Sequence, residues 1–305
     1  MIKSITVTNY LGDSIKLELT RPELSGFAIE SITGLGPAKA DVNTTEVSTN
    51  DGSIFNSARL TKRNVVMNLV FVDSIANESI EDIRHKSYKY FPVKKKVRLT
   101  IETDNRVSET EGYVEHNDPT IFSKREGCQI SIICPYPYLY SAGEENLTVF
   151  NGVDPSFEFP FSNESLTDDL IEMGAMKLHT EHVIVYNGDA EIGVTITINA
   201  FGEATHVAIH NIGTREVIRI DTDKLAVMTG SGIVAGDEIT ITTVKGNKAV
   251  TLLRNGKTTN ILNCLSRDAD WFQLVKGDNL FAYTAESGIG NLQFRIGNRV
   301  IYEGV

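Results

Sequence analysis

The stretch EITITTVKGNKAVTLLRNGKTTNIL, residues 238–262, predicts three antiparallel β-strands joined by two short turns. Apolar and polar residues alternate along its segments, which is the period of a strand with one buried face. The segments are separated by KGNK at 245–248 and by Asn255-Gly256, a dipeptide that favours tight hairpins. Such a meander is typical of β-sandwiches and β-barrels, so we expect a mainly β chain.

The same alternation recurs through the rest of the sequence. Residues 65–72 are apolar at nearly every position, which predicts a central strand with both faces covered. Other strands are predicted where one face is apolar: at Ile15, Leu17 and Leu19; at Val97, Leu99 and Ile101; and at Ile192, Val194, Ile196 and Ile198 after the turn Asn187-Gly188.

One segment has helical spacing instead. Apolar and small residues from Ile80 to Phe91 follow Ser79, and Asp82 stands three residues after that serine as a capping-box partner. The helix is expected to end before Pro92, because proline disfavours helical geometry at the residue before it. A short helical turn at 166–171 is a weaker prediction.

Chain length and a change in composition predict two domains. A chain of 305 residues exceeds the size at which a single hydrophobic core usually stops growing. Pro135 and Pro137 end a predicted strand, and a small polar stretch follows them. We therefore expect an N-terminal domain at 1–142 and a C-terminal domain at 143–305.

Charge and cysteine content limit the partners and the compartment. The net charge of -11 opposes binding to a nucleic-acid backbone, so no specific nucleic acid is expected. No segment has the pattern of a secretory signal or the length of a membrane span, which predicts synthesis in a cytoplasm and no membrane insertion. Cys128, Cys134 and Cys264 are an odd number and are interpreted as reduced thiols.

Motifs for nucleotide binding and nucleophilic catalysis are incomplete. Gly256-Lys257-Thr258 resembles the end of a phosphate-binding loop, but Thr251 stands where the first glycine is required. Gly230-Ser231-Gly232 lacks the spacing of a serine nucleophile elbow and is interpreted as a flexible loop. Cys128 and Cys134 share one face of a predicted strand, without an identifiable histidine partner. We therefore predict no catalytic residue and no cofactor-binding residue.

Potential metal ligands are interpreted as structural or surface residues. His179 and His182 lack the spacing of a zinc protease, and His206 and His210, expected on one strand face, have no third ligand nearby in the sequence. Asp221-Thr222-Asp223 begins like a calcium loop but has Ala226 where that loop needs glycine. The sequence thus predicts no metal site and no cofactor.

Charged clusters are interpreted as solvated surface. The carboxylate pairs Asp168-Asp169 and Asp268-x-Asp270 leave glycoside hydrolysis open by composition alone, but nothing marks either pair as perturbed. Lys62-Arg63 and Lys94-Lys95-Lys96 are expected at exposed strand ends. The chain is therefore expected not to be an enzyme.

A tryptophan loop supports one alternative function. Trp271-Phe272 and Tyr283 would suit sugar stacking, which makes a carbohydrate-binding module or adhesin for host recognition the competing hypothesis. The other explanation is core packing, because a lone tryptophan next to a phenylalanine in a β protein more often fills a core.

Collinear segments over nearly the whole chain resemble the distal tail proteins of long-tailed, siphovirus-type bacteriophages. In the first half these are an Asp51-Gly52 turn with Arg59, the strand start Arg63-Asn64, the helix at 79–91, the Gly-Tyr-Val-Glu strand at 112–115, and the Cys-Pro-x-Pro-Tyr end of a strand at 134–138. The second half contributes VYNGDAEIGVTITI at 185–198, the tryptophan loop DWFQLVKGDN at 270–279 and RIGNRVIYEGV at 295–305.

This resemblance implies a split-barrel-like N-terminal β domain with a helix and a galectin-like C-terminal β-sandwich. It also implies a structural, non-catalytic role at the virion tail tip, in a hexameric ring whose N-terminal domains surround a channel. The implied partners are other copies of the chain, the tail tube protein, the tail-associated hub protein and receptor-binding proteins. An acidic chain suits a channel that DNA must cross without sticking.

Overall fold

The computed structural model describes residues 1–305 apart from 47, 49–50, 144, 151, 156–173 and 178–179. Its described residues are mainly in strands, which confirms the predicted fold class. The chain divides into unit 1, Met1–Gly143 with Ile301–Val305, and unit 2, Glu144–Val300. The return of the last residues to unit 1 differs from the sequence analysis, which assigned everything after residue 142 to the second domain.

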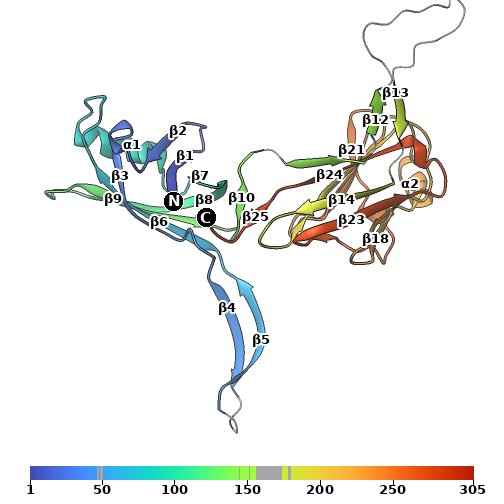
Figure 1. The fold of residues 1–305 in the computed structure, drawn as a ribbon, viewed down its shortest axis with the longest axis horizontal. Coiled ribbons are helices and arrows are strands. Elements are labelled where there is room, and N and C mark those ends of the chain that lie inside the picture. Colours follow the sequence, from blue (N-terminus) through green and yellow to red (C-terminus); the bar gives the residue numbers. More distant parts are fainter. Residues whose placement is uncertain (47, 49–50, 144, 151, 156–173, 178–179) are drawn as a thin grey trace, which may run out of the picture. The chain divides into compact units, whose positions relative to one another are not determined.

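Unit 1 is built on a nine-stranded sheet with the main order β2-β1-β7-β8-β9-β6-β3, to which β10 and β25 attach (Figure 1). The last strand, β25, pairs with β10 so that Leu139 lies opposite Tyr302 and Tyr140 opposite Ile301. The bounds are β1 Ile2–Thr8, β2 Ser14–Glu18, η1 Pro22–Leu24, β3 Phe27–Thr33, β6 Arg63–Phe71, β7 Lys96–Thr103, β8 Val107–Thr120, β9 Gly127–Cys134, β10 Leu139–Ser141 and β25 Ile301–Tyr302.

Helix α1, Ile80–Tyr90, packs on this sheet and begins and ends as predicted. The Ser79 hydroxyl accepts a hydrogen bond from the Asp82 backbone N–H, and the Asp82 carboxylate accepts one from the Ser79 N–H. Ile83 and Phe91 are fully buried in the core of unit 1. Within the described ranges, no helix is both long and apolar enough to cross a membrane.

The predicted strands of unit 1 are present, with one local difference. Strand β6 lies between β9 and β3, in agreement with its two apolar faces. Val97, Leu99 and Ile101 are all buried, as are Ile15 and Leu17. Leu19 is 41% exposed, because β2 ends at Glu18 and the residue lies outside the strand.

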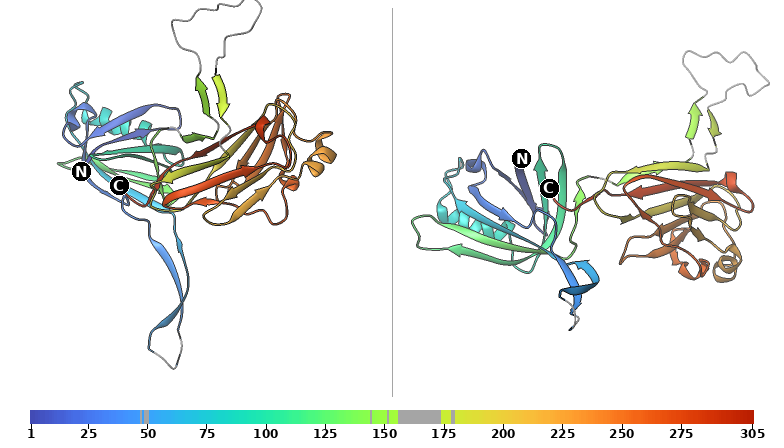
Figure 2. Two further views of the ribbon diagram at one scale, coloured as in Figure 1. Left: turned by 45° about the vertical axis from the view of Figure 1, so that its right-hand side comes forward. Right: turned by 60° about the horizontal axis from the view of Figure 1, so that its bottom comes forward.

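Strands β4, Ala40–Glu46, and β5, Ser53–Leu60, form a separate two-stranded sheet, which we call the arm. The arm extends away from the nine-stranded sheet in each view (Figures 1 and 2).

Unit 2 is a β-sandwich of a six-stranded sheet, β11-β24-β16-β19-β20-β21, and a four-stranded sheet, β14-β23-β17-β18. Tyr283 from one sheet stacks on Phe294 from the other, with ring centroids 3.8 Å apart. The bounds are β11 Asn146–Val149, β12 Gly152–Pro155, β13 Gly174–Lys177, β14 Glu181–Tyr186, β15 Ile192–Gly193, β16 Thr195–Ala200, β17 Ala208–Asn211, β18 Glu216–Arg219, β19 Glu238–Thr242, β20 Ala249–Arg254, β21 Lys257–Asn260, η2 Leu262–Cys264, β22 Gln273–Leu274, β23 Gly277–Thr284, η3 Ile289–Asn291 and β24 Leu292–Asn298.

The opening stretch forms the predicted meander. Strands β19, β20 and β21 are consecutive antiparallel neighbours, and Asn255 and Gly256 both have positive φ in the turn between the last two. Ile192, Val194, Ile196 and Ile198 are buried as expected.

Helix α2, Thr222–Thr229, was not predicted. Asp221, interpreted from sequence as part of a polar turn, is its N-cap and accepts a hydrogen bond from the Lys224 N–H. Gly230 ends the helix with a φ of 88°, a conformation that suits glycine. The aspartate and glycine flanking eight residues are the signal that could have identified this helix. The predicted helical turn at 166–171 lies outside the described residues.

Candidate functional site

The arm is amphipathic, as its register shows. Cross-strand partners share a face of a two-stranded sheet, and successive residues alternate between faces. One face therefore carries four pairs, which are Ala40 with Leu60, Val42 with Ala58, Thr44 with Phe55 and Glu46 with Ser53. The opposite face carries the pairs Asp41 with Arg59, Asn43 with Ser57 and Thr45 with Ile54.

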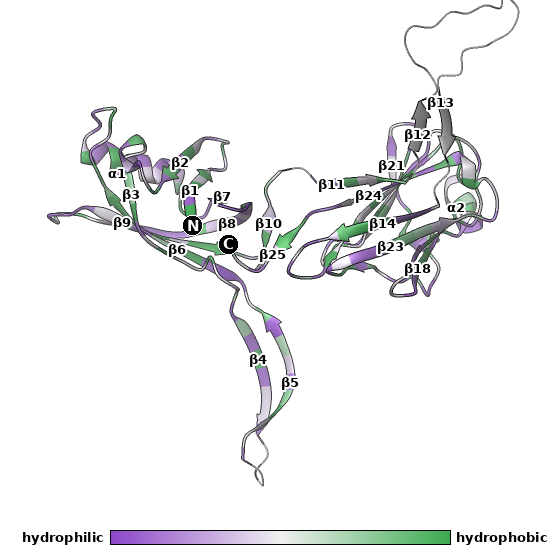
Figure 3. Cartoon of the chain, in the orientation of Figure 1, coloured by the Kyte–Doolittle hydropathy of each residue, from purple (hydrophilic) through white to green (hydrophobic). Residues whose placement is uncertain are grey.

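Polar contacts organise the second of these faces. Arg59 forms an ion pair of 3.3 Å with Asp41, and the Asn56 amide donates a hydrogen bond of 2.7 Å to the Thr45 hydroxyl. The first face, which we call the apolar arm face, is left open. Phe55 is 63% exposed and Val42 54% exposed, and hydrophobic positions are interleaved with polar ones along both strands (Figure 3).

This surface was missed by the sequence analysis. A β-bulge between Asn43 and Thr44 shifts the register, so the apolar residues of β5 do not keep a simple alternation along the chain. The residues Asp51-Gly52 and Arg59, which carried part of the family resemblance, both lie in the arm or its turn.

The solvent face of the nine-stranded sheet carries a ladder of amide, hydroxyl and carboxylate groups. The Gln129 amide donates to Asn68, and the Asn68 amide donates to Ser31, at 3.0 and 2.8 Å. Ser131 contacts both Asn64 and Glu115. These contacts connect β3, β6, β9 and β8 across the sheet.

Acidic groups continue this ladder toward the opposite edge of the sheet. The Glu111 carboxylate forms ion pairs with the Lys96 ammonium at 2.6 Å and with the Arg98 guanidinium at 2.9 Å. Glu102 accepts a hydrogen bond from Ser4 and pairs with Lys16, and these contacts lower the pKa of Glu102, the Ser4 hydrogen bond being the main cause. Paired polar groups therefore connect the strands across most of this face.

Arg63 is buried, contrary to the prediction from sequence. We expected Lys62-Arg63 to be an exposed strand end, and Lys62 is exposed, but Arg63 is only 2% exposed. Its guanidinium donates to the backbone carbonyls of Gly34, Gly36, Pro137 and Glu303, at 2.6 to 2.8 Å. Lys94, Lys95 and Lys96 are exposed as expected.

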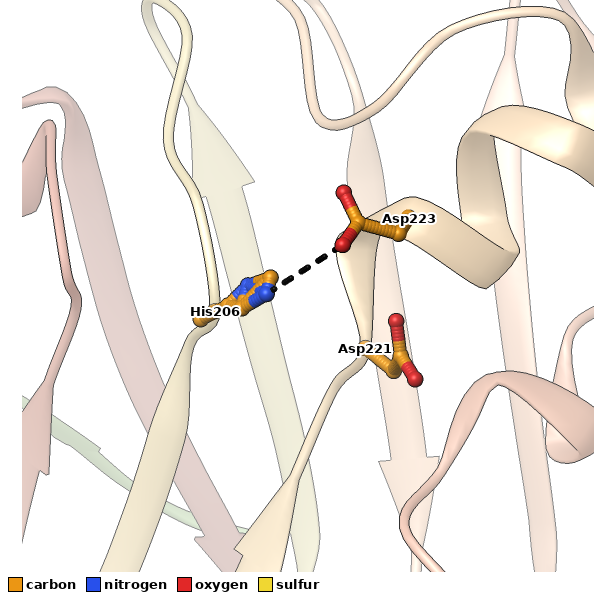
Figure 4. A group of neighbouring side chains, drawn as sticks. All are labelled: His206, Asp221 and Asp223. Carbon is orange, nitrogen blue, oxygen red and sulfur yellow. Dashed lines mark ion pairs between the residues drawn. The ribbon is translucent and has the colours of Figure 1, made fainter.

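Two sequence motifs that were considered separately meet in unit 2. His206 precedes β17 with a φ of 47°, so it does not share a strand face with His210 as expected. Donor atoms of His206, Asp221 and Asp223 lie within 4.8 Å of one another (Figure 4). Asp223 pairs with the imidazole Nε2 at 3.6 Å.

Existing contacts compete with a cation in this group. One carboxylate oxygen of Asp221 caps α2, and the other pairs with the Lys224 ammonium at 3.0 Å. The positive end of the helix dipole also disfavours a cation there. The group is therefore better explained as a helix cap with an exposed ion pair. His182 is exposed, while His179 and the pair Asp168-Asp169 lie outside the described residues.

The remaining candidates have structural roles in the described chain. All three cysteines are buried, and burial raises the pKa of the Cys128 thiol to about 12, which disfavours the thiolate. Asp268 pairs with Arg219 at 3.2 Å, and Asp270 accepts a hydrogen bond from the Val217 N–H. The Ser231 hydroxyl accepts a hydrogen bond of 2.7 Å from Arg254, which ties down the 230–232 loop that the sequence analysis interpreted as flexible.

The aromatic residues of the tryptophan loop separate into core and surface. Phe272 is 0% exposed and Tyr283 1% exposed, whereas Trp271 is half-buried. Trp271 lines a surface pocket together with Lys224, Asn263 and Arg267.

These features define a two-unit, mainly β protein whose most distinctive surface is a projecting hairpin. Residues 187–295 match the family described as siphovirus-type tail component, C-terminal domain. This match agrees with the resemblance of the second half of the chain to distal tail proteins.

Solved structures share the fold. The crystal structure of SPP1 Dit, described as a paradigm of the hub adsorption apparatus in Gram-positive infecting phages, is 12% identical with a TM-score of 0.65. The alignment covers 97% of this chain and 99% of SPP1 Dit. A chain of the phage P2 baseplate, in its activated conformation with Ca, is 13% identical with a TM-score of 0.49, covering 98% of both chains. No curated protein matches the chain.

Proposed function

We propose that this chain is the distal tail protein of a siphovirus-type particle. In this proposal it forms a hexameric ring at the tip of the tail and joins the tail tube to the tail-associated hub and the adsorption apparatus. The family match of residues 187–295 and the fold shared with SPP1 Dit over 97% of the chain support it. Its role is structural and not catalytic.

The observation that carries the proposal is the apolar arm face. An isolated two-stranded hairpin is at best marginally stable in water, and here Phe55 and Val42 remain more than half exposed. A second copy of the chain would cover this face, and cyclic symmetry would repeat the contact until the ring closes. The arm then belongs to the interface between neighbouring subunits.

The polar ladder on the solvent face of the nine-stranded sheet suits a channel wall. Amides such as Asn68 and Gln129 offer only neutral contacts to phosphate, and the cations Lys96 and Arg98 are already paired with Glu111. With a net charge of -11, the ring would let DNA pass without holding it. In the proposal, the protein is made in the cytoplasm of the bacterial host and carries receptor-binding proteins as outer partners.

The test is the mass of the purified full-length chain by light scattering, with negative-stain images of the same sample. We expect six-subunit rings, either with the chain alone or after mixing with its tube and hub proteins. Persistent monomers in both samples would contradict the proposal.

The alternative of a carbohydrate-binding module is weakened by the aromatic core. Phe272 packs against Phe281, and Tyr283 stacks on Phe294, so neither ring can stack on a sugar. Of Trp271, Phe272 and Tyr283, only Trp271 is partly exposed. A platform of several aromatic side chains is therefore not proposed.

A further inference from the structure

Trp271 stands in a surface pocket of unit 2 whose chemistry differs from that of the chain as a whole. The pocket has a volume of about 490 Å³, within the range of small-ligand sites. Among the described residues that line it, Lys224 and Arg267 are basic and none is acidic. In a chain with 40 acidic and 29 basic residues, this is a local reversal of charge.

The cations around the indole are incompletely neutralised. Among the residues that the structure describes, neither Arg267 nor Lys248 forms an ion pair or hydrogen bond. The Lys248 ammonium lies over the Trp271 ring, 5.0 Å from the ring centre. Lys224 is the exception, because it pairs with Asp221. Of the nearby carboxylates, Asp268 is paired with Arg219, whereas Asp270 keeps its charge and accepts a hydrogen bond from the Val217 N–H.

The backbone on both sides of Trp271 is held in place. The Asp270 N–H donates to the Val217 carbonyl at 2.9 Å, which fixes the residue before it. Phe272, the residue after it, is fully buried, and its carbonyl accepts hydrogen bonds from Thr243 and Gln273. The ring is therefore presented by a rigid segment, which reduces the entropy lost when a ligand binds.

We propose that this pocket binds a negatively charged carbohydrate, a sugar unit that carries a phosphate or a carboxylate. The indole offers an apolar face for the sugar ring, the free Arg267 guanidinium offers paired donors for the anion, and the Asn263 amide lies in the same lining. Lys248 adds positive potential beside the ring. This inference is independent of ring assembly, because the residues involved belong to unit 2 and not to the arm.

The chain supplies its own reporter, since Trp271 is its only tryptophan. Full-length protein is titrated with glucose 1-phosphate, glucuronate, glucose and inorganic phosphate while the tryptophan fluorescence is recorded. We expect saturable changes with at least one of the two charged sugars and a dissociation constant on the order of 1 mM. A response to only one charged sugar identifies the anion.

Matched variants assign the effect to the pocket. Arg267→Gln should weaken binding about tenfold or more, because it removes a charged hydrogen-bond donor. Arg215→Gln, at an exposed arginine of unit 2 outside the pocket lining, should leave it unchanged. Trp271→Phe, followed by calorimetry, should weaken binding while the urea unfolding midpoint stays close to that of the parent.

Three results would overturn the proposal. One is the absence of any fluorescence change and any heat with both charged sugars at about 10 mM, ten times the expected dissociation constant. Another is an equal response to glucose 1-phosphate and inorganic phosphate, since the sugar ring would then contribute nothing. The third is equal weakening by Arg267→Gln and Arg215→Gln. None of them bears on the mass of the assembled ring.

Discussion

Arg63 donates a hydrogen bond of 2.7 Å from Nη2 to the backbone carbonyl of Glu303, 240 positions later in the chain. The same guanidinium binds the carbonyls of Gly34, Gly36 and Pro137. Burial lowers the pKa of Arg63, and the nearby Cys134 opposes this effect. One buried cation thus fastens the C-terminal residues to unit 1 after the chain has passed through unit 2.

Replacement of Arg63 should destabilise unit 1 strongly. Arg63→Met keeps much of the apolar stem but leaves four carbonyls without their donor, so we expect a loss of about 3 kcal/mol or more in the free energy of unfolding. Arg63→Lys should not rescue it, because a single ammonium cannot reproduce the planar fork. Urea unfolding measures the loss. Arg98→Met, which removes a half-exposed partner of Glu111, is the control and should cost less than about 1 kcal/mol.

Arg254, whose side chain is 18% exposed, should make a contribution of similar size to the stability of unit 2. Arg254 binds both carboxylate oxygens of Asp237, at 2.7 and 2.6 Å, and Asp237 is only 2% exposed. Asp237→Asn removes the counterion and should cost about 3 kcal/mol of unfolding free energy. Asp268→Asn, in the exposed pair with Arg219, should change it by less than about 1 kcal/mol. Equal effects of the two variants would contradict this account.

Glu111 should contribute to the acid sensitivity of unit 1. Burial would raise its pKa, but hydrogen bonds from Lys96 and Arg98 outweigh burial, and the pKa is lowered from its ordinary value of 4.5. A lowered carboxyl pKa stabilises the fold above the ordinary value, and this contribution disappears as pH falls through the folded-state pKa.

The variant Glu111→Gln tests this pH-dependent contribution to stability. The variant should have a lower urea midpoint at pH 7 and the same midpoint at about pH 2, where both forms are uncharged. Because the carboxylate is 40% exposed, solvent screening keeps the difference below about 1 kcal/mol. Glu46→Gln, on the exposed arm, makes the same change of charge and should leave the midpoint unaltered at both pH values. A pH-independent effect of Glu111→Gln would contradict the proposed cause.

Short sequence patterns predicted the local secondary structure, but they did not predict long-range contacts. The period of two at 238–262 and the Ser79 to Asp82 capping box act over a few residues, so the sequence identified the meander and α1. The burial of Arg63 depends on carbonyls from four distant segments, one of them at Glu303. The charge of an arginine predicts that it is exposed, and the carbonyl groups that accept its hydrogen bonds come together only in the tertiary fold.

The sequence did not reveal the candidate surfaces, for related reasons. The bulge after Asn43 breaks the alternation by which the apolar arm face would be recognised. His206 and Asp223 are separated in sequence but paired in space, so neither motif indicated the other. Trp271 and Phe272 are adjacent, yet one lines a pocket and the other fills the core, a difference that composition does not encode.

The apolar arm face should control assembly without controlling folding. Phe55→Ser and Val42→Ser remove exposed apolar groups, so each should leave the urea midpoint of the monomer nearly unchanged while shifting light-scattering masses from rings toward monomers. Thr45→Ser, on the opposite face of the same hairpin, is the matched control and should assemble normally. If the Phe55 and Val42 variants form rings as readily as the parent, the arm does not hold the subunit interface.

Unit 1 should fold without unit 2, provided that it keeps the last strand. The chain leaves unit 1 after β10 and returns as β25, and these two strands pair antiparallel, so a short Gly-Ser turn can replace residues 144–300. Unit 1 also has its own hydrophobic core around Leu17, Met67 and Ile132. The shortened chain should therefore unfold cooperatively in urea.

A chain that ends at residue 143 loses β25 and the Glu303 acceptor of Arg63, so it should be less stable than the shortened chain by about 2 kcal/mol or more. Equal stability of the two chains would show that the C-terminal residues contribute nothing to unit 1, and a shortened chain that does not unfold cooperatively would show that the units depend on each other.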